Sequence, residues 1–165
     1  FQNGRFKVNP INMNNNFIKI LQDHCLLFYT GISRFASNIA SSQIKNTPEK
    51  KHELNAMKGY VKDALNIIDS KRGNIEDFGR LLDENWKLKK SLSKKISNSS
   101  IDQIYSDVIS AGAYGGKLLG AGGGGFILFI AKPELHEIIK EKLRKLLHVD
   151  FAFSDGGSKI IFNQE

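Results

Sequence analysis

The 165-residue sequence contains one cysteine and no hydrophobic run of the about 18 residues that a membrane-spanning helix needs. A single cysteine, Cys25, excludes an internal disulfide framework and suits a reducing compartment, so we expect a cytoplasmic protein. The first twenty residues also lack the basic start and apolar core of a signal peptide. The histidines, His24, His52, His136 and His148, lack metal-ligand spacing, and we expect no metal site among them.

Acidic residues are the scarcer charge. Lys and Arg number 24 against 17 Asp and Glu, which gives a net charge of +7. A basic face could bind nucleic acid, an acidic membrane surface or phosphorylated small molecules. The sequence has no RNP-type aromatic motif, helix-turn-helix signature or zinc finger, so we expect neither nucleic acid nor a membrane as partner. A compositional bias is the other explanation, since the chain is also rich in Asn and Ile.

The apolar runs predict strands. Cys25–Tyr29 and Phe126–Ile130 are continuous and short, which is typical of buried strands. Two closing strands are predicted over 151–153 and 159–162, around a Gly156-Gly157 turn. A turn signal and an alternating run predict the remains of a hairpin within residues 1–8, and the three asparagines at 14–16 predict a loop.

Helices are predicted from apolar residues recurring at steps of three and four. The predicted ranges are 32–45, 48–68, 75–86, 100–109 and 133–147. In the second range we expect the face with Leu54, Met57, Val61, Leu65 and Ile68 to point into the core. The order of strand, several helices, strand, helix and two strands is typical of an α+β fold: an antiparallel sheet with helices packed mainly on one face.

Glycine is concentrated immediately before the second predicted strand, with five glycines in residues 120–125. Gly120, Gly122 and Gly125 match G-x-G-x-x-G, but a dinucleotide site needs a helix after that motif, and here a strand follows. A phosphate loop of the Walker type is excluded because Phe126 follows the last glycine. Such a run suits a close approach of backbone to a ligand or to a neighbouring loop, and a tight strand entry is the alternative.

The segment 116–125, with the sequence GKLLGAGGGG, resembles the third motif of the GHMP small-molecule kinases. Other segments are similar to the bacterial heptose-phosphate kinase branch of that family. They are 26–34 (LLFYTGISR), 86–92 (WKLKKSL), 96–98 (ISN), 101–105 (IDQIY) and 112–116 (GAYGG). The resemblance covers nearly the whole chain.

The resemblance implies a ferredoxin-like C-terminal domain of a longer, two-domain kinase. Residues 1–165 would form this domain, with 1–22 as a residual N-terminal hairpin and connection. The full-length enzyme would use ATP and Mg²⁺ and phosphorylate the anomeric hydroxyl of a heptose 7-phosphate to the 1,7-bisphosphate. Because the family's phosphate loop and catalytic Asp lie in the N-terminal domain, and no Gly-Ser-Ser cluster occurs here, we expect no catalytic residue in this chain and no activity from it alone.

Other interpretations remain open at this point. The chain could be the C-terminal domain of another GHMP small-molecule kinase. It could also be a non-catalytic α+β module that binds a phosphorylated metabolite through an anion nest. We expect its own N-terminal domain as a partner, and a homodimer through an exposed face is the alternative.

The resemblance also implies site residues. The glycine motif expected near the ATP phosphates consists of Lys117, Gly120, Ala121, Gly122, Gly123, Gly124 and Gly125. Side-chain chemistry adds the substrate-binding candidates Arg34, Trp86, Lys89 and Ser97. Arg34 and Lys89 could bind a phosphate, a sugar ring could stack on Trp86, and Ser97 could offer its hydroxyl. Each has a structural alternative: Arg34 and Lys117 as solvated surface residues, Trp86 as a core residue. Ser97 could instead cap the helix near Ile101.

Overall fold

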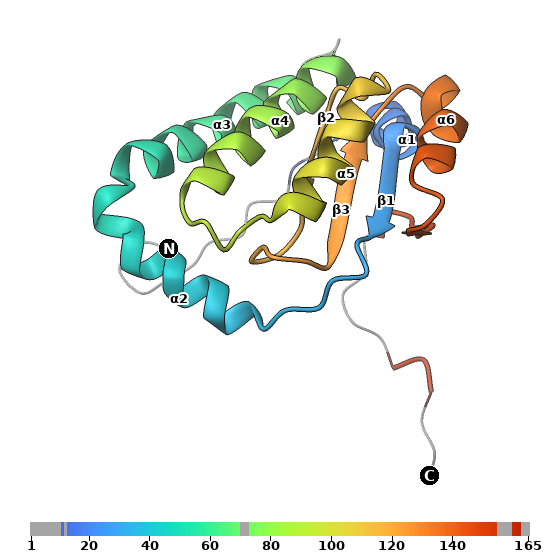
Figure 1. Ribbon diagram of the computed structural model, residues 1–165. Coiled ribbons are helices and arrows are strands. Elements are labelled where there is room, and N and C mark those ends of the chain that lie inside the picture. Colours follow the sequence, from blue (N-terminus) through green and yellow to red (C-terminus); the bar gives the residue numbers. More distant parts are fainter. Residues whose placement is uncertain (1–10, 12, 70–72, 155–159, 163–165) are drawn as a thin grey trace.

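The computed structural model describes residues 11, 13–69, 73–154 and 160–162 (Figure 1). The hairpin predicted within 1–8 and the Gly156-Gly157 turn lie outside these residues. The helices are α1 (Asn15–His24), α2 (Ala36–Asn46), η1 (Thr47–Glu49), α3 (Lys51–Asp69), α4 (Ile75–Ser91), α5 (Ser99–Ser110), η2 (Pro133–Leu135) and α6 (His136–Lys142). The strands are β1 (Cys25–Tyr29), β2 (Gly115–Leu118), β3 (Phe126–Ile130) and β4 (Leu147–His148).

The four strands form one antiparallel sheet in the order β2-β3-β1-β4. The two central strands pair along their whole length, from Cys25 opposite Ile130 to Tyr29 opposite Phe126. These are the two strands that the apolar runs predict. The predicted α+β fold with an antiparallel sheet is therefore confirmed, and the strand order is that of a ferredoxin-like domain.

The closing strands predicted over 151–153 and 159–162 are wrong, because the described residues there form no strand. Leu147–His148 pairs with β1 instead, as the edge strand β4. In the segment 151–153, the backbone bonds to a side chain instead of to a neighbouring strand. The Gln22 amide nitrogen donates to the carbonyl oxygen of Phe151 (2.9 Å). Its amide oxygen accepts from the backbone N–H two residues later (2.9 Å).

Helix α1 and strand β2 are two elements that the sequence pattern did not predict. The loop predicted at Asn14–Asn16 is instead the start of α1, where the Asn14 side chain accepts from the Asn16 N–H (2.8 Å) and so caps the helix. Strand β2 begins with Gly115 and Gly116, which have low strand propensity and hide it from the pattern. The predicted helix 133–147 ends at Lys142.

The main core lies against one face of the sheet. Leu26 and Phe28 of β1 and Phe129 of β3 are fully buried there. Helices α4, α5 and α6 cover this face with Trp86, Ile101, Tyr105, Val108 and Ile139, and Leu143, directly after α6, joins them. A smaller cluster forms where α1 packs on the opposite face, at Ile130. The helices are thus mainly on one face, as predicted.

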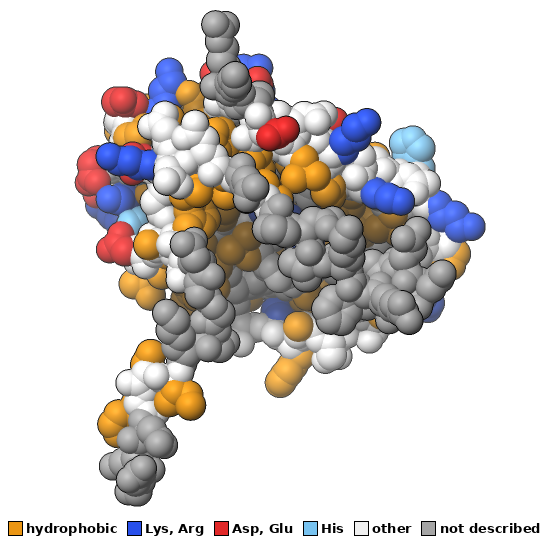
Figure 2. Space-filling view, turned by 180° about the vertical axis from the view of Figure 1, so that it is seen from behind, with side chains coloured by type: hydrophobic (Ala, Val, Ile, Leu, Met, Phe, Trp, Pro, Cys, Tyr) orange, Lys and Arg blue, Asp and Glu red, His pale blue; other side chains and the backbone are white. Residues whose placement is uncertain are grey.

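The prediction that the apolar face of α3 points into the core is wrong for much of the helix. No residue of α3 is buried, and Val61 is 61% exposed. The helix packs beside α4 rather than on the sheet (Figure 1). Seen from behind, hydrophobic side chains are exposed over much of the molecule (Figure 2). None of the described helices is long and apolar enough to cross a membrane.

Helix α4 lies directly on the edge strand β2. A Cβ atom on Gly115 would come within 2.0 Å of the carbonyl oxygen of Gly79, so the backbones can meet only because Gly115 has no side chain. A hydrogen-bonded tyrosine links the same elements to α5. The Tyr105 hydroxyl donates to the Asp83 carboxylate (2.5 Å) and lies 3.2 Å from the Gly116 carbonyl oxygen.

Replacing Tyr105 by phenylalanine is expected to lower the free energy of unfolding by about 2 kcal/mol. The ring would keep its packing, but a hydrogen bond to a charged carboxylate would be lost. Urea unfolding measures the change. The control is Tyr60→Phe, since the half-buried Tyr60 makes no hydrogen bond with a described residue. Equal effects of the two substitutions would contradict the prediction.

Candidate functional site

The β2–β3 loop, residues 119–125, is shaped by glycines without which its neighbours could not approach. Gly120, Gly122 and Gly123 have positive φ angles of 71°, 121° and 76°. A Cβ on Gly122 would lie 2.9 Å from the Ile96 Cα, and one on Gly124 would lie 2.2 Å from the Ile32 carbonyl oxygen. The loop therefore rests on two other chain segments, the α4–α5 connection and the β1–α2 connection.

Hydrogen bonds fasten the loop to these segments. The Gly123 N–H donates to the carbonyl of Ile96 (2.8 Å), and the Gly125 N–H donates to that of Ile32 (2.9 Å). The buried Thr30 donates to the Gly125 carbonyl through both its N–H and its hydroxyl, each at 2.8 Å. The β1–α2, α4–α5 and β2–β3 connections are distant in sequence, and these hydrogen bonds join them into one continuous surface.

Several loop amides remain without a protein acceptor. Within the described residues, the N–H groups of Gly120, Ala121 and Gly124 donate to no backbone or side-chain acceptor. In contrast, the carbonyl of Ala121 accepts from the Gln43 side chain (2.8 Å). Unpaired backbone N–H groups in a glycine-rich turn can bind an anion such as a phosphate oxygen.

A pocket of about 580 Å³ opens beside this loop. We call it the basic pocket; its lining includes Arg34, Lys94, Lys95, Ser97, Asn98 and Gly123. No carboxylate lines it, and none of its three cations forms an ion pair with a described residue. Three cations in an acid-free hollow would attract a multiply charged anion.

The structure brings together three of the residues predicted from the sequence: Arg34, Ser97 and Gly123. Ser97 is not the helix cap, because the Asn98 side chain accepts from the Ile101 N–H (3.0 Å) and caps α5. The Ser97 hydroxyl donates to Asp102 (2.9 Å). Its role toward a substrate stays a prediction.

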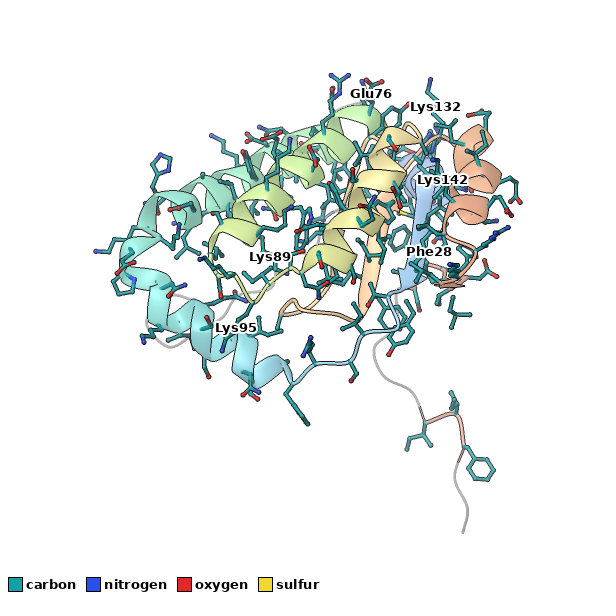
Figure 3. All side chains as sticks on the ribbon, viewed as in Figure 1. Phe28, Glu76, Lys89, Lys95, Lys132 and Lys142 are labelled. Atoms are coloured by element: carbon teal, nitrogen blue, oxygen red, sulfur yellow. The ribbon has the colours of Figure 1, made fainter. Side chains whose placement is uncertain are left out.

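Sequence reasoning missed Lys94, Lys95 and Asn98. The available signal was position: the lysines come directly before the 96–98 segment that carries part of the resemblance. Figure 3 shows Lys95 at the same end of the molecule as the β2–β3 loop.

Trp86 does not lie in the site, which corrects its prediction as a substrate-binding residue. Its side chain is fully buried in the main core, so no face of the ring is open to a ligand. The alternative given above, a core tryptophan, is the one that the structure has.

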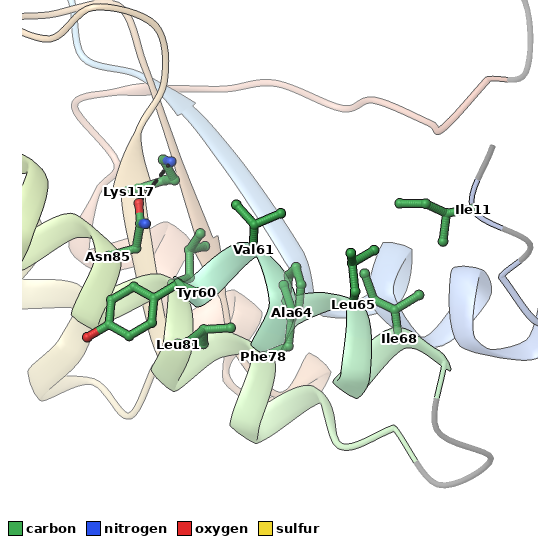
Figure 4. A pocket seen from close by; sticks show the side chains of 11 residues that line it. Ile11, Tyr60, Val61, Ala64, Leu65, Ile68, Phe78, Leu81, Asn85 and Lys117 are labelled. Atoms are coloured by element: carbon green, nitrogen blue, oxygen red, sulfur yellow. Dashed lines mark hydrogen bonds between the residues drawn. The ribbon is translucent and has the colours of Figure 1, made fainter. Parts of the chain in front are cut away.

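Lys117 lies away from the basic pocket. Its side chain is on the opposite face of the sheet, at an apolar pocket of about 320 Å³ lined also by Val61 and Leu65 (Figure 4). Its ammonium is 3.4 Å from the Asn85 amide oxygen, and burial lowers its pKa. A role beside ATP phosphates stays a prediction.

Lys89 reaches the glycine loop but does not line the basic pocket. Its ammonium donates to the Gly120 carbonyl (2.6 Å) and lies 3.4 Å from the Leu118 carbonyl oxygen. Burial and the neighbouring Lys117 lower the pKa of Lys89 to about 8. Its predicted contact with substrate stays untested.

Metal and thiol chemistry find no support in the part of the chain that the structure describes. It contains no group of three or more His, Cys, Asp or Glu side chains that could hold a metal ion. Burial raises the pKa of the Cys25 thiol to about 11, so the thiol is protonated and unreactive near neutral pH.

Comparison with known proteins identifies the family of this chain. The family model described as "GHMP kinases C terminal" matches residues 62–149. This range holds α4, α5, β2, the glycine loop, β3, α6 and β4. The chain belongs to the GHMP kinase family. The prediction made from the glycine motif is confirmed.

Among its GHMP relatives, the D-glycero-alpha-D-manno-heptose 7-phosphate kinase of Campylobacter jejuni is 32% identical over 96% of this chain. The L-fucokinase/L-fucose-1-P guanylyltransferase of Bacteroides fragilis is 34% identical over 84% of it. The L. major mevalonate kinase shares the fold, with a TM-score of 0.69 over 89% of this chain and 46% of that chain at 19% identity. The chain spans 48% of the heptose 7-phosphate kinase and 16% of the fucokinase protein.

Proposed function

We propose that this chain is the C-terminal domain of an ATP-dependent sugar kinase that phosphorylates the anomeric hydroxyl of a heptose 7-phosphate, giving the 1,7-bisphosphate. The observation that carries the proposal is the basic pocket, where Arg34, Lys94 and Lys95 lie with Gly123 and form no ion pair with a described residue. An acceptor that already bears a phosphate supplies the missing negative charge. The similarity to the heptose 7-phosphate kinase of C. jejuni over nearly the whole chain supports the same acceptor.

The chain's own residues would act by positioning and by charge. Phosphoryl transfer depends mainly on holding donor and acceptor in line and on neutralising the phosphate oxygens. The cations of the basic pocket would bind the acceptor's phosphate. The unpaired amides of the loop would donate to an ATP phosphate or to the phosphate loop of the N-terminal domain.

The catalytic base and the Mg²⁺ ligands are assigned to that N-terminal domain in this proposal. The described residues offer neither a cluster of acidic metal ligands nor an activated nucleophile at the loop. We therefore expect the 165-residue chain alone to show no turnover. It supplies half of the site, and the polypeptide that carries it supplies the other half.

The test is an ATP-turnover assay on the full-length protein with heptose 7-phosphate, unphosphorylated heptose, galactose and fucose as acceptors. We expect kcat/KM for heptose 7-phosphate to exceed that for the neutral sugars by about 100-fold, since about 3 kcal/mol of charge-assisted binding would be absent with them. Phosphorus NMR of the product should show a second, anomeric phosphate. Equal turnover of neutral and phosphorylated acceptors would contradict the proposal.

A fucokinase domain is the second candidate, because the B. fragilis relative has the higher identity of the two. Fucose is neutral and would leave the three cations of the basic pocket without a partner. Preference for fucose in the same assay would favour this candidate. Binding of a sugar phosphate without any turnover would favour a non-catalytic module.

A further inference from the structure

Lys89 occupies an unusual position for a lysine. It lies in the last turn of α4 and is half-buried (Figure 3). Among the described residues, its ammonium donates to two backbone carbonyls, that of Leu118 at the end of β2 and that of Gly120 in the β2–β3 loop. Its neighbours on the helix are paired with acids: Lys87 with Asp83 (2.7 Å) and Lys90 with Asp102 (2.9 Å). No carboxylate of the described residues pairs with Lys89.

The C-terminal turn of α4 and two carbonyl oxygens attract the Lys89 ammonium, but no carboxylate of the described residues compensates for its burial. Removing an ammonium from water is costly unless an opposite charge compensates for it. Here the other charged group that acts on Lys89 is Lys117 of β2, which repels it, and the lowered pKa of both side chains reflects the burial. A methionine of similar length would fill the same space without that cost.

The contact has a geometric consequence for the loop. The peptide unit is planar and trans, so the C=O of one residue and the N–H of the next point in opposite directions. Holding the Gly120 carbonyl against Lys89 therefore turns the Ala121 N–H away from α4. The Gln43 side chain holds the next carbonyl, that of Ala121, and in the same way directs the N–H of Gly122. Among the described residues, the Ala121 N–H has no acceptor.

We propose that Lys89 is a positioning residue, which fixes the peptide plane between Gly120 and Ala121 so that the amide of Ala121 is presented to a phosphate oxygen. This inference rests on the proposed function, since it assumes that the loop faces phosphate groups in the full-length protein. Lys89 itself does not touch the substrate. It acts through the loop, unlike the cations of the basic pocket.

The first experiment compares Lys89→Met with Lys62→Met in the full-length protein. Lys62 is exposed on α3 and forms no hydrogen bond or ion pair with a described residue, so its removal deletes the same charge without changing the contacts of the loop. We expect Lys89→Met to lower kcat about 10-fold with the acceptor KM nearly unchanged, since the Ala121 amide would be misaligned in the transition state. Its melting temperature should be equal to or above that of the parent.

Hydrogen exchange gives a readout that does not need activity. The amides of Leu119 and Gly123 are hydrogen-bonded to Phe126 and Ile96 and should be protected. Lys89→Met should speed their exchange several-fold, while Lys62→Met should not. Unchanged protection in Lys89→Met overturns the proposal. Altered protection in a protein that phosphorylates no sugar would support the positioning role and remove the proposed function.

A pH profile separates the ammonium from the length of the side chain. As pH rises through about 8, Lys89 loses its proton, and the neutral amine is a weaker donor to the loop carbonyls. We expect kcat to fall about 5-fold across this limb. Lys89→Arg, whose guanidinium stays charged, should retain most of the activity and lack the limb. A limb that persists unchanged in Lys89→Arg overturns the assignment.

Discussion

Replacing Gly124 with alanine is expected to lower the free energy of unfolding by about 3 kcal/mol and to reduce the kinase activity of the full-length protein by about 100-fold. The new Cβ would stand 2.2 Å from the Ile32 carbonyl oxygen and 2.9 Å from its carbon. Both atoms are backbone, held between β1 and α2, so the loop must move instead. A displacement of about 1 Å at an active-site loop is enough for such a loss.

Two glycine substitutions serve as controls for this prediction. Gly59→Ala on α3 meets no atom within 4 Å and should be neutral or stabilising by up to about 1 kcal/mol. Gly125→Ala also has open space around it, but its φ of 95° makes it strained, so it should cost about 1 kcal/mol. Urea unfolding and turnover measure all three. A Gly124→Ala protein as stable as Gly59→Ala would show that the close contact is absent in solution.

The sequence predicts the elements whose signal is local. Strands β1 and β3 are apolar along their length because both lie in the centre of the sheet, so their pattern alone identifies them. The conformation of residues 151–153 depends instead on hydrogen bonds to Gln22, which lies more than a hundred residues earlier in the chain. The period of α3 shows that one face is apolar, but not whether another element covers that face.

The site follows the same division. Dense glycine marks the loop directly, because few other residues could adopt its backbone at Gly122 and Gly123. The basic pocket forms only when two distant connections fold around that loop and place Arg34 near Lys95. Trp86 is the opposite case: its position three residues before Lys89 on one helix face suggested a ligand contact, but the packing of α4 buries its side chain.

Replacing Arg34 with methionine should raise the KM for heptose 7-phosphate about 30-fold and leave the KM for ATP within about 2-fold. The substitution would remove a charge-assisted contact to the acceptor's phosphate, about 2 kcal/mol in binding. Arg34 makes no ion pair with a described residue, so its loss should hardly change the free energy of unfolding. Initial-rate kinetics on the full-length protein measure both constants.

Turnover of unphosphorylated heptose shows whether Arg34 binds the acceptor's phosphate or supports the loop. If the guanidinium binds that phosphate, kcat/KM for unphosphorylated heptose should be the same in Arg34→Met and in the parent. Lys95→Met should shift the two acceptors in the same way, because its ammonium shares the basic pocket. Lys132→Met, an exposed lysine outside this pocket, removes an equal charge and should change neither acceptor. A loss of equal size for phosphorylated and unphosphorylated heptose would mean that Arg34 supports the loop and that the phosphate binds elsewhere.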